Sequence, residues 1–265
     1  MQSFNYTKPA SVADAAAALS GAADGTLLAG GMTLLPTMKA RLASPSDLVD
    51  LGGVAELKGI SVSGGNVTIG AMTRHQDVAD SADVQGAIPA LAALAGGIGD
   101  QAVRNRGTMG GSVANNDPAA DYPAAVLGLG ATVTTNSRSI AADDFFTGMF
   151  ETALAEGEII TSISFPQAEK AAYVKFPNPA SRYAMVGVFV AKTAGGVRVA
   201  VTGAGSGGVF RVAAYESALA ANFSADAIAD GAVSAADMND DLHADSEYRA
   251  HLVAVMTRRA VEACG

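Results

Sequence analysis

The sequence has almost no cysteine, since Cys264 is the only one among 265 residues. A single cysteine cannot form an internal disulfide, and an iron–sulfur cluster needs several thiolate ligands. The chain therefore has neither a disulfide framework nor such a cluster of its own. Because disulfides are typical of oxidising compartments, this cysteine usage favours a reducing cytoplasm.

Charged residues are also scarce, at 16% of the chain, whereas hydrophobic residues make up 49%. This balance excludes disorder over most of the length and allows a substantial core. Acidic residues outnumber basic ones, for a formal net charge of −9, and no cluster of Lys and Arg reverses that sign locally. A phosphate backbone would be repelled, so we expect no nucleic-acid partner.

Signals for a membrane segment, an export sequence or a metal centre are missing as well. Apolar stretches such as residues 87–98 are short and broken by Gly and Pro, and residues 1–10 lack a basic start. The histidines, His75, His243 and His251, show no metal-ligand spacing. We expect each of them at the surface or at an interface, and no metal site.

The apolar and glycine pattern of the first 95 residues predicts mixed helices and strands. Ser11 can cap a helix over 12–19, with Asp14 at its third position, and Gly21 ends that helix. A strand, a helix and a second strand then predict a βαβ-like unit at 26–29, 34–42 and 48–51. A hairpin and two helices are expected after it, at 60–69, 75–80 and 88–95.

Residues 96–121 are rich in Gly and Asn, and no regular element explains them. Structureless stretches of that length within a domain are usually functional. The rest of the chain predicts strands at 131–134, 159–165, 186–190 and 197–202, and helices at 212–220, 225–229 and 248–262. Because 265 residues exceed the usual domain size, we expect two domains, with a boundary in the polar segment 166–170.

Two glycine-rich segments could bind a phosphate group. The first, residues 27–36, places Gly30 and Gly31 between a strand and a helix. Glycine lets backbone N–H groups converge on an anion, which suits a diphosphate. An ordinary turn would use the same residues, so the first segment is ambiguous on its own.

The second segment, residues 104–121, contains hydroxyls, paired glycines and a carboxylate. Thr108 and Ser112 supply the hydroxyls, and Asp121 could accept hydrogen bonds from a ribose or ribityl group. A polar cofactor would use all of these groups, although a solvated surface loop remains the alternative.

A third glycine-rich segment, residues 203–208, fits the dinucleotide pattern G-x-G-x-x-G between an expected strand and helix. A Rossmann unit needs a second parallel strand after that helix, whereas another helix is expected there. We therefore interpret this segment as a structural turn.

Taken together, LLAGGMTLLP and RNRGTMGGSVANNDPAAD resemble the FAD-binding medium subunit of molybdenum hydroxylases, the carbon monoxide dehydrogenase and xanthine dehydrogenase group. The later segments GEIITSISFP, KFPNPASRYAMVGVFV, VRVAVTGAG and DLHADSEYRAHL extend this resemblance over nearly the whole chain. It implies an α+β protein whose residues 1–168 form a FAD-binding domain of the vanillyl-alcohol oxidase and p-cresol methylhydroxylase type, with subdomains of about 1–52 and 53–168. Residues 169–265 would form a small α+β C-terminal domain, with an antiparallel sheet plus helices.

The resemblance also implies a set of contacts to FAD. The diphosphate would be clasped by Leu27, Leu28, Ala29, Gly30, Gly31, Met32, Thr33 and Leu34 on one side and by Thr108, Gly110, Gly111 and Ser112 on the other. Asp121 would hold a cofactor hydroxyl, Ile160 would pack near the flavin, and Tyr183 would lie beside the isoalloxazine. The family often has Gln or His and then Ser after the glycine pair, so at Met32-Thr33 only backbone contacts are expected.

Some of these residues have a plainer interpretation. Ile160 suits the core of any strand, and Tyr183 could be an aromatic residue at a domain interface. Arg104 and Arg106 could either help neutralise the diphosphate or form salt bridges on an acidic surface.

The function implied by the resemblance is an FAD-dependent electron-transfer subunit. Substrate would be oxidised at molybdenum on a large subunit, electrons would cross the iron–sulfur clusters of a small subunit, and FAD would pass them to an external acceptor. The assembly would be a dimer of heterotrimers. The alternatives are a self-contained flavin oxidase or reductase, for which no acid or base is identified, and a cofactor-free assembly or storage module with structural glycine loops.

Overall fold

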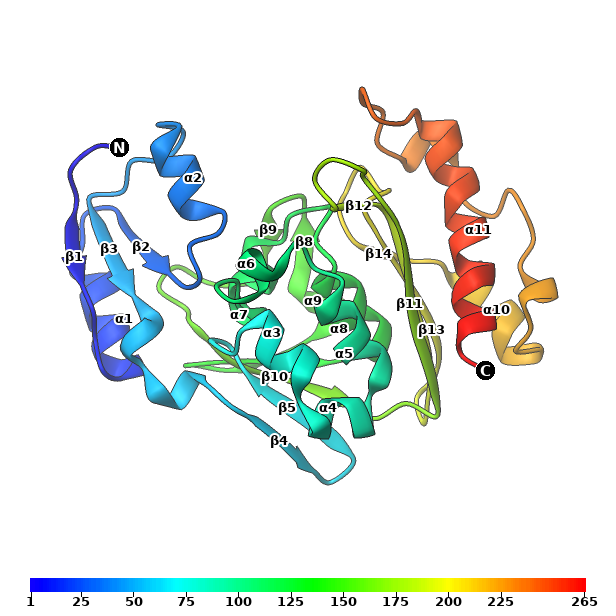
Figure 1. The fold of residues 1–265 in the computed structure, drawn as a ribbon, viewed down its shortest axis with the longest axis horizontal. Coiled ribbons are helices and arrows are strands. Elements are labelled where there is room, and N and C mark those ends of the chain that lie inside the picture. Colours follow the sequence, from blue (N-terminus) through cyan, green and yellow to red (C-terminus); the bar gives the residue numbers. More distant parts are fainter.

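The computed structural model describes all of residues 1–265. A three-stranded parallel sheet, a five-stranded antiparallel sheet and a four-stranded antiparallel sheet follow one another from the N-terminal to the C-terminal side (Figure 1). Helices cover the sheets, so the fold is of the predicted mixed α+β class.

The N-terminal unit contains the parallel sheet, in the order β1-β3-β2. The cap predicted for its first helix is confirmed, because the Ser11 hydroxyl accepts a bond from the Asp14 N–H at 3.1 Å and Gly21 ends the helix. Parallel pairing of β2 with β3 confirms the βαβ-like unit, although the second helix ends at Lys39 rather than Leu42. The elements are β1 (Asn5–Thr7), α1 (Val12–Ser20), β2 (Gly25–Leu28), α2 (Leu34–Lys39) and β3 (Asp47–Asp50), followed by the 3-10 turns Leu51–Gly53 and Ala55–Leu57.

The central unit is built on the five-stranded sheet, in the order β4-β5-β10-β6-β7. The predicted hairpin and the helix His75–Asp80 are confirmed. The elements are β4 (Ile60–Ser63), β5 (Asn66–Gly70), α3 (His75–Asp80), α4 (Ala82–Ala87), α5 (Pro89–Gly96), α6 (Gln101–Arg104), α7 (Met109–Asn115), α8 (Tyr122–Leu129), β6 (Thr132–Thr135), β7 (Ser139–Ala141), α9 (Ala142–Phe145), β8 (Phe146–Gly148), β9 (Glu151–Thr152) and β10 (Ile160–Pro166).

The expectation that no regular element lies within residues 96–121 is wrong, because α6 and α7 lie there. The first turn of α7 contains Gly110 and Gly111, which are poor helix formers. Tertiary packing overrides this propensity, since Met109 and Val113 are fully buried on the inner face of the helix.

The C-terminal unit has the antiparallel sheet β11-β12-β13-β14 with helices after it, as predicted. The glycine segment 203–208 connects the antiparallel strands β13 and β14, so a strand and not a helix follows it, and no Rossmann unit is present. The elements are β11 (Lys170–Pro177), β12 (Ala184–Thr193), β13 (Gly196–Thr202), β14 (Phe210–Arg211), α10 (Ala213–Ala221), the 3-10 turns Ala225–Ala227 and Ala235–Asp237, and α11 (Ser246–Ala263).

The main hydrophobic core includes residues from both sides of the expected domain boundary at 168/169. Phe189 of β12 and Ala200 of β13 belong to the same buried cluster as Val126 of α8. The opposite face of the C-terminal sheet packs on α10 and α11 in a second cluster. The division into two domains at this boundary therefore stays a prediction. None of the helices is both long and apolar enough to cross a membrane.

Candidate functional site

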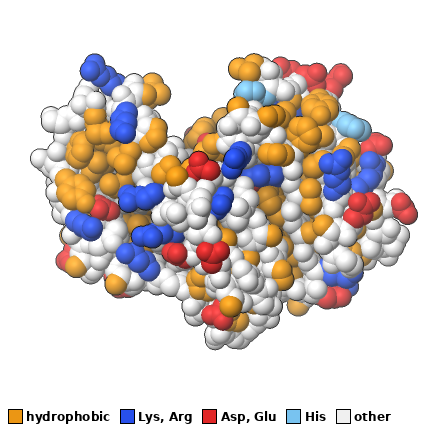
Figure 2. Space-filling model, in the orientation of Figure 1, with side chains coloured by type: hydrophobic (Ala, Val, Ile, Leu, Met, Phe, Trp, Pro, Cys, Tyr) orange, Lys and Arg blue, Asp and Glu red, His pale blue; other side chains and the backbone are white.

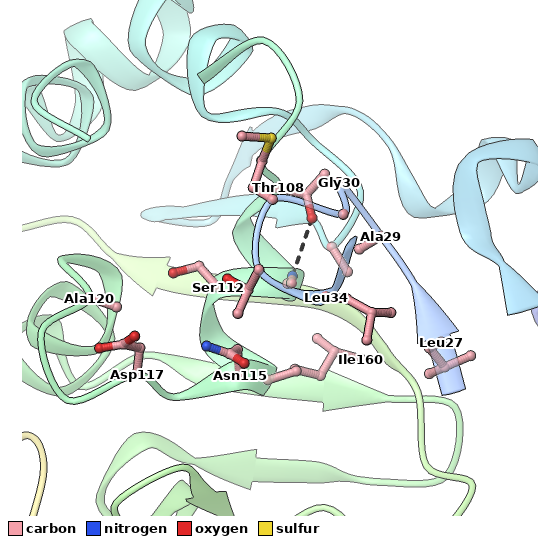
Figure 3. A pocket seen from close by; sticks show the side chains of 18 of the residues that line it. Leu27, Ala29, Gly30, Leu34, Thr108, Ser112, Asn115, Asp117, Ala120 and Ile160 are labelled. Atoms are coloured by element: carbon pink, nitrogen blue, oxygen red, sulfur yellow. Dashed lines mark hydrogen bonds between the residues drawn. The ribbon is translucent and has the colours of Figure 1, made fainter. Parts of the chain in front are cut away.

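A cavity of about 590 Å³ lies where the N-terminal unit meets the central unit and the turn before β12. Its walls come from β2 and the loop after it, from residues 98–121, from the start of β10 and from residues 181–183. Figure 3 shows the first loop, residues 108–120 and Ile160 around this space. The molecular surface is hollowed between the N-terminal unit and the rest of the protein (Figure 2). The size lies within the range of cofactor sites.

Nearly all of the predicted FAD contacts are brought together at this cavity. Leu28 does not line it. The wall contains Leu27, Ala29, Gly30, Gly31, Met32, Thr33, Leu34, Thr108, Gly110, Gly111, Ser112, Asp121, Ile160 and Tyr183. That each of them contacts the cofactor stays a prediction.

The loop between β2 and α2 presents unpaired backbone donors. The N–H groups of the five consecutive residues 30–34 donate to no protein acceptor, and the first bonded amide is that of Leu35, to the Gly31 carbonyl. Gly31 has φ of +74°, a left-handed conformation that glycine adopts without strain. A row of free N–H groups at a cavity wall suits phosphate oxygens, so this loop fits a diphosphate.

The second segment contributes differently from what we expected. The first N–H groups of α7 are already used, since those of Met109 and Gly110 donate to carbonyls of residues 73 and 71 at 3.0 and 2.8 Å. The Gly111 N–H donates to the Thr108 hydroxyl at 3.2 Å, the bond drawn at Thr108 in Figure 3. The groups that remain for a ligand here are the hydroxyls of Thr108 and Ser112.

The glycines of both segments permit close packing. A Cβ on Gly30 would lie 2.1 Å from the Arg106 carbonyl oxygen, and one on Gly110 would lie 2.5 Å from the Ala71 Cβ. The two segments thus meet backbone to backbone at Gly30. Gly30 and Gly110 must therefore lack a side chain for the chain to pack in this way, whether or not they contact the cofactor.

Neither arginine of the second segment does what we expected. The Arg104 guanidinium donates to the Gln76 side chain at 3.0 Å and to the Ile98 carbonyl at 3.1 Å. Arg106 meets the first loop through its carbonyl oxygen. Neither side chain lines the cavity, and neither forms a salt bridge. Arg104 is therefore held by uncharged acceptors, a side-chain amide and a backbone carbonyl.

Asp121 lies at the wall, but its carboxylate is already engaged. The Tyr173 hydroxyl and the Lys175 ammonium, both on β11, donate to it, the latter at 3.0 and 3.2 Å. Burial raises the pKa of Asp121 although Lys175 opposes that shift. A cofactor hydroxyl would therefore share this carboxylate with two protein donors, which the sequence did not indicate because β11 was not predicted.

His75 does not lie at the surface, which was one of the two positions expected for it, but in the wall of the cavity. It is 5% exposed, lines the cavity at the start of α3, and packs on Tyr122 with ring centroids 5.2 Å apart. Burial, with a smaller effect of the Arg104 charge, lowers the pKa of His75 to about 4. The imidazole is therefore neutral, and its Nδ1, like the Tyr122 hydroxyl, has no hydrogen-bond partner. No local sequence pattern distinguishes this histidine from an exposed one.

Ile160 and Tyr183 complete the predicted set from two other parts of the chain. Ile160 is 5% exposed at the start of β10, so it serves the core and the cavity wall at once. Tyr183 is 46% exposed and follows Arg182, whose φ of +65° is strained for a side chain of that size. Arg182 itself, Asn115 and Asp117 also line the cavity and were not predicted.

Comparison with known proteins assigns this chain to a flavin-binding class. The family described as "FAD binding domain in molybdopterin dehydrogenase" matches residues 2–168. The carbon monoxide dehydrogenase medium chain of Hydrogenophaga pseudoflava is 35% identical, over 98% of this chain and 96% of its own length. The nicotine 6-hydroxylase medium subunit of Paenarthrobacter nicotinovorans is 34% identical, over 100% and 98% of the two chains.

A solved structure supports the same assignment over the whole length. It is that of carbon monoxide dehydrogenase from Hydrogenophaga pseudoflava lacking the Mo-pyranopterin moiety of its cofactor, with a TM-score of 0.91, 36% identity and coverage of 99% of this chain and 97% of that one. The chain belongs to the family of FAD-binding medium subunits of molybdenum hydroxylases, and within it is similar to the carbon monoxide dehydrogenase medium chain. FAD is therefore its cofactor, which excludes the cofactor-free alternative.

Proposed function

We propose that this chain is the electron-transfer subunit of a cytoplasmic molybdenum-containing hydroxylase or dehydrogenase. It would take electrons from the iron–sulfur clusters of a small subunit and pass them to an external acceptor, while a large molybdopterin subunit oxidises the substrate. The expected assembly is a dimer of heterotrimers. Bound FAD supplies the two-electron redox chemistry, and the protein positions it.

The observation that carries this proposal is the row of free N–H groups at residues 30–34 on the wall of the 590 Å³ cavity. We infer that these groups bind the diphosphate, with the hydroxyls of Thr108 and Ser112 on the opposite side. Asp121 would accept a cofactor hydroxyl alongside Lys175. Ile160 and Tyr183 would pack against the flavin.

Three titratable groups of the cavity support electron transfer over substrate oxidation by this chain alone. Asp121 is held by Tyr173 and Lys175, and Glu158 is held by Arg138 at 3.0 Å, which keeps its pKa well below the usual range. His75 is buried and neutral. None of these is a free acid or base poised for a substrate, which a self-contained oxidase would need.

The test is purification of the protein at native levels from its source. An iron–sulfur subunit and a molybdopterin subunit should co-purify with it, and the complex should oxidise a substrate that the isolated chain cannot. A chain that purifies alone and turns over an organic substrate with its own FAD would instead be a self-contained oxidase.

A further inference from the structure

The His75 ring lies close to the loop of residues 30–34, because both pack against Gly107. A Cβ on Gly30 would lie 2.8 Å from the Gly107 Cα, and a Cβ on Gly107 would lie 2.5 Å from the His75 Nε2. The His75 N–H also donates to the Gly107 carbonyl at 3.0 Å. All three residues line the cavity. Only the width of one glycine therefore separates the imidazole from the N–H groups proposed to bind the diphosphate.

The two ring nitrogens of His75 have different surroundings. Nδ1 is fully buried and has no hydrogen-bond partner. Nε2 has no protein partner either, but it is not buried, and it lies on the side of the ring that faces Gly107 and the cavity. An accessible nitrogen without a partner in a cavity wall is available to a ligand.

Negative charge predominates in the wall of this cavity. The carboxylates of Asp117, Asp121 and Glu158 line it, whereas Arg182 is its only Lys or Arg. Arg182 donates to the Gly99 carbonyl at 3.3 Å and belongs to the turn before β12, not to the first loop. A diphosphate brings about two further negative charges, so its binding would gain from a positive charge beside residues 30–34. His75 can supply that charge by taking up a proton.

The elements packed against α3 do not stabilise a charge on the ring. Tyr122 of α8 packs on it with an unpartnered hydroxyl, and Arg104 of α6 opposes a positive charge there. Asp121, next to Tyr122, is paired with Lys175, and α5 contains no titratable residue. In the FAD-free chain, burial therefore keeps the pKa of His75 at about 4. The other charged residues in and beside α3, α4 and α6 are exposed, namely Arg74, Asp77, Asp80, Asp83, Asp100 and Arg106.

We propose that His75 takes up a proton when FAD binds, and that the resulting imidazolium donates from Nε2 to an oxygen of the diphosphate. The proton comes from solvent and forms the second N–H bond of the ring, with no change of redox state. A hydrogen bond between two opposite charges at a site largely shielded from water is strong enough to offset the loss of solvent around the ring. The inference rests on the proposed binding of the diphosphate at residues 30–34.

Calorimetric titration of FAD into the FAD-free full-length chain measures this proton directly. At about pH 5.5, the difference in heat between two buffers of unlike ionisation enthalpy gives the number of protons bound, and we expect more than about half a proton per FAD. The affinity of the unaltered chain for FAD should be about tenfold higher at pH 5.5 than at pH 8, a comparison that needs no variant.

His75→Gln keeps a side chain that can donate a hydrogen bond but cannot become charged. This variant should lose both the proton uptake and the dependence of FAD affinity on pH. His251→Gln, at an exposed position on α11, is the matched control and should behave as the unaltered chain does.

The inference is overturned if FAD binding takes up no proton at pH 5.5. It is also overturned if the uptake persists in His75→Gln, because a carboxylate of the wall would then be the group that titrates. Gly31→Val separates the two levels of the argument. Unaltered FAD affinity in Gly31→Val would remove the placement of the diphosphate as well, whereas weakened binding there, with uptake persisting in His75→Gln, would remove only the role of His75. Co-purification of partner subunits depends on neither result.

Discussion

At the level of single residues, the cavity proposed to bind the flavin depends on positions where a side chain is absent or uncharged. Gly30 lets its backbone touch the Arg106 carbonyl, and Gly31 holds the left-handed turn that precedes α2. His75 sits in the wall as a neutral ring because its charged form cannot be solvated there. Each of these features is open to a substitution test.

Gly31→Val should weaken FAD binding at least tenfold while the fold survives. A Cβ at this position lies 2.9 Å from Leu35 Cδ1, and φ of +74° is strained for a β-branched residue, so the row of N–H groups must move. Equilibrium dialysis measures the FAD affinity of the variant, and circular dichroism checks that the variant is folded.

The matched control for this substitution is Gly207→Ala, because a Cβ on Gly207 meets nothing within 4 Å. Gly203 is unsuitable as a control, since its Cβ would lie 2.3 Å from the Ala184 carbonyl oxygen. Unaltered FAD affinity in Gly31→Val would show that residues 30–34 form only a turn.

Protonation of His75 should lower the free energy of unfolding of the FAD-free chain as the pH falls. Its pKa is about 4 in the folded chain and about 6.5 when unfolded, so between these values the unfolded chain binds a proton that the folded chain excludes. The free energy of unfolding should therefore be unaffected above pH 6.5 and drop by a total of about 3 kcal/mol towards pH 4.

Urea unfolding at several pH values, compared between the unaltered chain and His75→Gln, isolates this titration from that of the carboxylates. The difference in the free energy of unfolding between the unaltered chain and His75→Gln should change between pH 6.5 and pH 4. The control His251→Gln, at an exposed position, should show no such change relative to the unaltered chain. Parallel curves for His75→Gln would mean that the ring is hydrated in the folded state.

At the scale of elements, α7 shows how a weak helix is held at the site. Its first turn contains two glycines, but the Thr108 hydroxyl caps it and its first amides bond to residues 71 and 73. At its other end Asn116 adopts φ of +42° and donates from its side chain to the carbonyls of Gly148 and Glu151. The helix is therefore defined by contacts at both ends rather than by propensity.

Thr108→Val should cost about 1 kcal/mol of the free energy of unfolding, because the Gly111 N–H loses its acceptor within a buried site. Thr108→Ser retains the hydroxyl and should stay close to the unaltered chain. Urea unfolding of the FAD-free protein measures both. Equal stabilities of the Val and Ser variants would show that the cap contributes little.

At the scale of the whole molecule, the cavity and the core both join parts of the chain that are far apart. The C-terminal sheet has one face on α5 and α8 and the other on α10 and α11. The buried pair Asp121–Lys175 links the second glycine-rich segment to β11 across the same interface. The FAD-binding part and the C-terminal part are thus expected to depend on each other.

A fragment of residues 1–168 should not fold stably by itself. Removing β12 and β13 exposes the face of α8 that packs on Phe189, and leaves Asp121 without Tyr173 and Lys175. Thermal unfolding followed by circular dichroism should show a single transition for residues 1–265 and no cooperative transition for the fragment. A cooperative fragment that binds FAD would show that the boundary at 168 separates independent domains.

The features that could be predicted from the amino-acid sequence alone are local ones. Ser11 as a cap, the turn of two glycines between β4 and β5, the helix at His75–Asp80 and the glycine pair after β2 depend on residues a few positions apart, and their chemistry can be read directly. The two glycine-rich segments also indicated the cofactor, because their motifs resemble one family.

The arrangement of these local features around the cavity depends on the folded chain. Folding places Gly30 against Arg106 and brings Lys175 into contact with Asp121, 54 positions earlier. It also makes the glycine-rich stretch helical at α7 and buries His75. Each of these depends on packing between distant segments, where loss of solvent and close contact outweigh local propensity, so no window of sequence contains them.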